Sequence, residues 1–236
     1  MVPGNIDQSD MAQSDIDQGS TAIQAELPVL PEWCRVTQLA DLVRIFEPDI
    51  QVCAWQREID PAIAAYLSHV EPAGEQQLLE TMTPGSKPAL DRLPEAPGRE
   101  ALMDDLVLLR DIICELLACE AVGLRLARID HAMCPGWHID RTGIRLVCTY
   151  QGPGTEWLDD QDVDRSYLQS PDHANKAFNQ AAAGELVLLK GSLWQGNDDF
   201  GAVHRSPELS QSEAASSDGV STSLRTVITL DPLWYE

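Results

Sequence analysis

The sequence predicts an α+β fold, in which an N-terminal part with helices packs against a β-rich C-terminal part. Two patterns indicate this class. From Arg99 to Cys119, apolar residues recur at the spacing of one helix face, and charged residues occupy the other faces. After Cys119, short apolar runs are separated by clusters of Gly, Pro, Asp and Ser, which is typical of an all-β sandwich or barrel.

The composition divides the chain into three regions. Residues 1–27 are rich in Asp, Gln, Ser and Gly and show no sustained apolar period, so we expect a disordered tail. Residues 28–97 carry short helix and strand signals and form a helical or mixed region. Residues 98–236 begin with the long predicted helix and continue into the β-rich domain. A chain of 236 residues is long enough to bury a sizeable core.

The region before the long helix contains three predicted elements. Residues 37–46 have helical spacing, with Thr37 in the N-cap position. Gln51–Arg57 has strand character. Asp60 and Pro61 open a second helix, because proline suits the first helical turn. The apolar stripe expected on the first helix is Leu39, Leu42, Val43 and Phe46.

Proline and serine content predicts two connections. Five prolines between Glu71 and Arg99 favour a loop over regular structure. The Ser-rich stretch Ser206–Ser223 is predicted to be a mobile loop between two strands. The apolar runs predicted as strands are Val122–Ile129, Ile144–Tyr150, Glu185–Leu189, Gly201–His204 and Leu224–Leu230.

The charge balance excludes two classes of partner. With 38 acidic and 16 basic residues the formal charge is −22, which repels phosphate backbones and anionic lipid surfaces. We therefore expect neither nucleic acid nor a membrane as partner. No apolar run has the length of a transmembrane helix, and the first residues lack the pattern of a secretory signal. The six cysteines include no Cys-x-x-Cys pair, which fits reduced thiols in the cytoplasm.

A candidate metal site combines two distant segments. His138 and Asp140 stand two residues apart just ahead of a predicted strand, so in an extended segment both side chains point to one face. His204 ends a later apolar run and supplies a second imidazole. Two histidines and one carboxylate on one face are the ligands of facial-triad Fe(II) sites. The alternative is an ordinary hydrogen bond between histidine and aspartate.

Two arginines are candidates for binding an anionic cofactor. Arg225 opens the apolar run that follows His204, and a planar guanidinium suits a bidentate contact with a carboxylate. Arg145 and Lys190 each interrupt an apolar strand. Such a charge usually faces outward. The alternative is an inward group that meets a substrate or cosubstrate anion, and Arg145 is retained as a cofactor-binding candidate on that basis.

Three motifs resemble a known family. Residues 145–158 (RLVCTYQGPGTEWL), 189–191 (LKG) and 203–207 (VHRSP) are similar to a bacterial family catalogued as domain of unknown function 1826 (DUF1826). The resemblance covers most of the chain past the tail and names no reaction. Members are associated with zinc-limitation gene clusters beside metallochaperone GTPases, so the resemblance implies such a GTPase as a partner.

The order of His138, Asp140, His204 and Arg225 also looks like that of iron and 2-oxoglutarate dioxygenases. This likeness implies a double-stranded β-helix (jelly-roll or cupin-like) for the C-terminal domain. It implies Fe(II) held by the two histidines and the aspartate, with 2-oxoglutarate anchored by Arg225. The activity implied is oxidation of a small-molecule or protein substrate that the sequence does not name.

A second hypothesis is a non-catalytic zinc-binding protein that serves zinc homeostasis. His131 and Cys134 precede the metal motif, and a thiolate sulfur favours zinc over iron. A cysteine ligand would close the site, whereas a turn cysteine would leave it open. His173 is expected to be solvated at a helix start. Three tryptophans are candidates for a substrate wall, namely Trp137, Trp157 and Trp194.

Overall fold

The computed structural model describes residues 32–70, 76–91, 93–198, 200–209 and 224–235. The predicted tail at residues 1–27 lies outside the described residues, and so does most of the predicted Ser206–Ser223 loop. No helix in the described ranges is both long enough and apolar enough to cross a membrane.

Two β-sheets form the centre of the molecule. The larger sheet has seven strands in the order β1-β2-β8-β5-β10-β4-β3, in which β1 and β2 are parallel and all other neighbours are antiparallel. The smaller sheet has the order β7-β6-β9. The strands of the larger sheet are β1 (Glu32–Val36), β2 (Ile50–Trp55), β3 (Gln76–Met82), β4 (Ala121–Ile129), β5 (Ile144–Gln151), β8 (Leu186–Lys190) and β10 (Arg225–Leu233). Those of the smaller sheet are β6 (Glu156–Trp157), β7 (Asn179–Gln180) and β9 (His204–Arg205).

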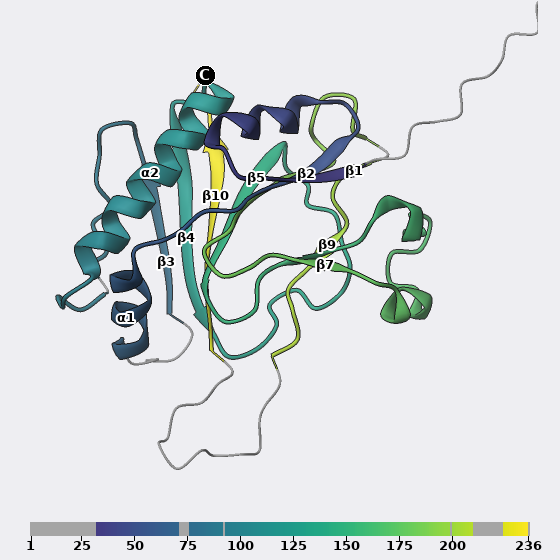
Figure 1. The fold of residues 1–236 in the computed structure, drawn as a ribbon. Coiled ribbons are helices and arrows are strands. Elements are labelled where there is room, and N and C mark those ends of the chain that lie inside the picture. Colours follow the sequence, from purple (N-terminus) through teal and green to yellow (C-terminus); the bar gives the residue numbers. More distant parts are fainter. Residues whose placement is uncertain (1–31, 71–75, 92, 199, 210–223, 236) are drawn as a thin grey trace, which may run out of the picture.

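Helices cover one face of the larger sheet (Figure 1). They are α1 (Pro61–His69), α2 (Arg99–Leu117) and the 3₁₀ helix η1 (Leu39–Phe46), while the short η2 (Asp160–Asp162) and η3 (Pro171–Asn175) follow β6. The predicted start of α1 is confirmed, because the Asp60 side chain accepts a hydrogen bond from the backbone N–H of Ala62 and Pro61 occupies the first turn. The long helix α2 is also confirmed, with Leu102, Leu106, Leu109 and Ile113 buried.

The two faces of the larger sheet bury separate apolar clusters. On one face, α2 and α1 pack on side chains such as Leu126, Leu146 and Ile228. On the other face, the next residues along the strands, among them Ala127 and Val147, pack beneath the smaller sheet. Burial on both faces explains why these strands read as nearly continuous apolar runs. The mixed α+β class predicted from the sequence is confirmed.

The first helix differs from its prediction. It is a 3₁₀ helix that begins at Leu39, Gln38 takes the cap position, and no side chain caps it. Its buried residues are Leu42 and Ile45, three apart as three residues per turn requires. The predicted α-helical stripe was therefore wrong at its other positions, Leu39, Val43 and Phe46, which are exposed.

The predicted loop between Glu71 and Arg99 contains a strand. β3 pairs antiparallel with β4 along its whole length and forms one edge of the larger sheet. The prolines of the described part of this segment follow the strand and do not interrupt it. An edge strand needs only one covered face and one paired side, so its polar residues concealed it.

Strands from both sides of residue 98 share the larger sheet, since β1, β2 and β3 flank strands from the C-terminal part. The boundary itself stays a prediction. All six cysteines of the chain are free thiols, as expected.

Candidate metal centre

His138 and His204 are brought together by backbone pairing. The N–H of each donates to the carbonyl of the other, both at 3.0 Å, so the segment at His138 pairs with β9 on the side opposite β6. Residues paired in this way project their side chains to the same face. The two imidazole rings accordingly lie with centroids 4.4 Å apart.

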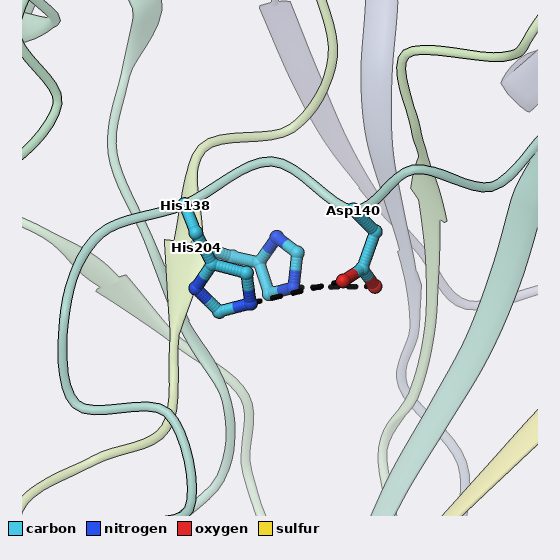
Figure 2. Close-up of side chains that lie close together, drawn as sticks. All are labelled: His138, Asp140 and His204. Atoms are coloured by element: carbon cyan, nitrogen blue, oxygen red, sulfur yellow. Dashed lines mark ion pairs between the residues drawn. The ribbon is translucent and has the colours of Figure 1, made fainter.

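Asp140 completes the cluster (Figure 2). Its carboxylate oxygens lie 3.7 Å from His138 Nε2 and 3.6 Å from His204 Nε2. One ligand atom of each residue falls within 4.8 Å of the others, so a single ion can contact all three side chains. Among the described residues, no other group of histidine, cysteine, aspartate and glutamate side chains gathers in this way.

The outer nitrogens of both imidazoles are already held by the backbone. His138 Nδ1 lies 2.9 Å from the Gly136 carbonyl oxygen, and His204 Nδ1 lies 2.9 Å from that of Ala202. A carbonyl only accepts, so each Nδ1 carries the proton and each Nε2 keeps its lone pair toward Asp140. Metal-binding histidines are oriented in this manner. The donor set and its orientation therefore fit a divalent transition metal.

Electrostatics favour the ligand forms of two of these side chains. Burial and the neighbouring His204 lower the pKa of His138, which favours its neutral form. Burial alone would raise the pKa of Asp140, but the hydrogen bond to His204 and the charges of His204, Arg145 and His138 lower it to about 2. The carboxylate is thus ionised at neutral pH.

Arg145 joins the metal cluster to the larger sheet. Its Nη1 donates to Asp140 Oδ2 at 2.7 Å, and its Nε and Nη2 donate to the two Asp231 oxygens at 2.7 and 2.9 Å. Although burial opposes the charged form, these hydrogen bonds and carboxylate charges raise the pKa of Arg145. Its donors already meet two carboxylates, so cofactor binding by Arg145 stays a prediction.

Arg225 is buried without a carboxylate partner. It is 3% exposed, and its Nη2 donates to the hydroxyls of Thr149 and Thr155 at 3.2 and 3.0 Å. Its Nη1 donates to the Ser206 hydroxyl at 3.3 Å, and its Nε has no partner. Burial lowers the pKa of this guanidinium to about 10. In the described part of the chain, no carboxylate forms an ion pair with this cation.

One cavity of about 100 Å³ contains all the predicted site residues. Cys134 also lines it but is not a member of the metal cluster, and neither is His131. The prediction of a tryptophan wall is not borne out by the lining, because Trp157 is buried between the sheets and neither Trp137 nor Trp194 borders the cavity.

Sequence reasoning missed several lining residues, namely Arg125, Thr155, Arg205 and Ser206. Arg125 gave the same signal as Arg145, a charge inside an apolar run. The prediction for His173 was wrong, because it is buried in η3, where its Nε2 accepts from the Asp164 N–H at 2.8 Å.

Fold and site together define an α+β protein with a candidate metal centre of two histidines and one aspartate beside a buried arginine. The chain belongs to the family described as a protein of unknown function, DUF1826, whose model matches residues 36–231. The resemblance seen in the sequence motifs is thereby confirmed. Among curated proteins, no significant match was found.

Solved structures with a similar fold include three proteins named for known or related activities. A prolyl-4-hydroxylase of Pseudomonas putida is 15% identical, with 84% of this chain and 100% of that chain covered and a TM-score of 0.42. A bsmA homolog of Methylobium petroleophilum is 14% identical over 87% and 94%, with a TM-score of 0.45. The Arabidopsis thaliana dioxygenase for auxin oxidation, in complex with 2-oxoglutarate, is 11% identical over 76% and 74%, with a TM-score of 0.39. At these scores we draw nothing about this chain's chemistry from them.

Proposed function

We propose that this protein is an Fe(II)- and 2-oxoglutarate-dependent oxygenase. One observation carries the proposal: a triad of two histidines and one aspartate shares a cavity with Arg225, a buried guanidinium that no described carboxylate neutralises. A buried charge without a partner is costly. An anionic cosubstrate would supply the missing partner beside the metal.

The roles of the residues follow from their contacts. His138 and His204 would bind the metal through Nε2, and Asp140 would bind it through its carboxylate. Three protein ligands leave coordination positions for a cosubstrate. When bound, the iron and 2-oxoglutarate supply the oxidising chemistry, in which decarboxylation of the cosubstrate is coupled to oxidation of a substrate.

Arg225 would bind the far carboxylate of 2-oxoglutarate. Thr149 and Thr155 hold its Nη2 in place, while Nε remains available to an acceptor. A fixed, planar guanidinium binds a carboxylate through two parallel hydrogen bonds. Burial strengthens this ion pair, because little solvent screens it.

The finer fold assignment is also proposed. The smaller sheet packs on the face of the larger sheet that carries the site, and the metal ligands lie on and beside β9. Two facing antiparallel sheets with a ligand site between them suit the double-stranded β-helix.

The zinc-binding alternative lacks the fourth ligand that would distinguish it. Cys134 is exposed and its sulfur lies outside the metal cluster, so the described site has the three protein ligands of an open centre. Zinc handling and association with a metallochaperone GTPase therefore stay predictions.

Turnover of 2-oxoglutarate tests the proposed function. Protein loaded anaerobically with Fe(II) should convert 2-oxoglutarate to succinate when air is admitted, and His138→Ala and Asp140→Ala should each abolish both iron binding and turnover. His69→Ala, which removes an exposed histidine of α1, serves as the matched control and should retain both. Unchanged turnover in both site variants would refute the proposed function.

A further inference from the structure

Arg125 occupies the same face of the larger sheet as the candidate metal centre. On β4 it alternates with Leu124 and Leu126, which pack under the helices, so its side chain faces away from them. Its partner across β10 is Thr229. Arg125 and Thr229 both line the cavity that contains the metal triad.

No carboxylate pairs with Arg125 in the part of the chain that the structure describes. Its one polar contact is a weak one, from Nη2 to the sulfur of Met133 at 3.7 Å. Its Nε is buried and has no hydrogen-bond partner. By contrast, Arg145 and Arg205, on the same cavity, are both bound to carboxylates. Arg125 therefore resembles Arg225 in keeping unused donors.

A second cavity continues from the first past Arg125. It has a volume of about 390 Å³ and shares Arg125, Arg145 and Thr229 with the metal cavity. Its far side is formed by β3, where Leu79 is 71% exposed. The two cavities form a groove from the sheet edge to the metal triad, of a size that suits a small molecule.

The charge of this groove differs from that of the molecule. Four arginines line the metal cavity, and among its described lining residues Asp140 is the only acid. The whole chain carries a formal charge of −22. A local concentration of positive charge in a low-dielectric cleft attracts anions that the remaining surface repels.

We propose that Arg125 binds the carboxylate or phosphate group of a small anionic substrate lying in this groove. Arg225 holds the cosubstrate, whereas Arg125 positions the substrate between β3 and the metal triad. The oxidation of that substrate rests on the proposed function, but the binding of an anion at Arg125 does not. The exposed Leu79 side chain offers an apolar contact to the part of the substrate farther from the metal.

Calorimetric titration with inorganic phosphate tests the proposal. The full chain is titrated at constant ionic strength, loaded anaerobically with Fe(II) and 2-oxoglutarate so that Arg225 is occupied. Arg125→Gln should weaken phosphate binding at least tenfold, and Arg125→Lys should weaken it less. Arg44→Gln, which removes an exposed arginine far from the groove, is the matched control and should bind phosphate as the original chain does. Equal phosphate affinity in the original chain and both Arg125 variants would overturn the proposal.

A second background separates this proposal from the proposed function. In Arg225→Gln, phosphate binding reports on Arg125 whether or not 2-oxoglutarate binds, and adding Arg125→Gln should remove it. If the original chain fails to bind 2-oxoglutarate but this loss occurs, the oxygenase proposal fails and the anion site stands. If 2-oxoglutarate binds but the double variant retains phosphate binding, the anion site fails alone. Thermal melting identifies any variant that does not fold, in which case Arg125→Lys decides.

Discussion

His138 and His204 owe their proximity to two backbone hydrogen bonds and their orientation to two backbone carbonyls. No long side chain has to be ordered to bring the rings together, so the entropic cost of forming the site is low. The spacing of His138 and Asp140 allowed the sequence to predict that they share a face. That His204 would lie opposite His138 could not be read from spacing, because strand pairing is a long-range property.

Arg145 shows why the direction of a charged strand residue is hard to predict. Both faces of the larger sheet are covered, so alternation along a strand gives no solvent side. Arg145 faces the metal cavity, whereas Lys190 lies on the other side, where its Nζ donates to the Glu47 carbonyl oxygen at 2.8 Å. The outward reading was wrong for Lys190, which is 2% exposed.

We predict that Arg145 positions the metal-binding carboxylate. Its removal in Arg145→Gln leaves Asp140 without its 2.7 Å hydrogen bond, and metal affinity should fall by about 10- to 100-fold, as for other residues that orient metal ligands. Competition between the protein and a chromophoric chelator for Fe(II) measures this. Arg44→Gln should have no effect, and equal affinities in all three proteins would show that Asp140 is positioned without Arg145.

The turn that carries Asp140 is held by the segment that follows β8. Ser192 N donates to the Asp140 carbonyl oxygen at 2.9 Å, and Leu193 N donates to that of Thr142 at 2.9 Å. A Cβ on Gly191 would lie 2.6 Å from the Asp140 carbonyl oxygen and 2.4 Å from that of Thr142. The metal ligand is therefore placed by a close backbone approach that only glycine permits.

Gly191→Ala should consequently displace Asp140 and lower metal affinity by about tenfold or more, since small misplacements of a site group are costly. Gly123→Ala is the control, because the nearest atom to its added Cβ is 3.9 Å away. Metal titration followed by tryptophan fluorescence compares the two. Metal affinity unaltered by Gly191→Ala would mean that the turn adjusts without moving the ligand.

Periodicity predicted elements well where burial is one-sided and regular. α2 was located from its stripe because one face of it packs on the sheet. The central strands β4, β5, β8 and β10 were located as apolar runs. β3 was missed because its stability comes from pairing with β4 at the sheet edge, which no local pattern encodes.

The molecule separates the core that holds it together from the face that carries the site. The helix-side cluster contains most of the fully buried side chains, and Asp105 of α2 fixes that helix to β5 by accepting a hydrogen bond from Tyr150 at 2.5 Å. The metal triad and both unpaired arginines lie on the other side of the sheet. Stability and binding should therefore respond to different substitutions.

Leu106→Ala tests this separation. Leu106 is fully buried on α2, so its truncation should lower the free energy of unfolding by about 2–5 kcal/mol. The stoichiometry of bound Fe(II) should remain that of the original chain, because the site lies on the opposite face. Urea denaturation and metal analysis measure the two quantities. Loss of metal binding in the folded variant would show that the two faces are coupled.

The most direct test of the central claim is an anaerobic titration of the protein with Fe(II) and then 2-oxoglutarate, followed by visible absorption. We predict a charge-transfer band that requires both components, disappears in Arg225→Gln and persists in Arg44→Gln. Stoichiometric metal without any such band in the original chain would contradict the oxygenase assignment and favour metal handling.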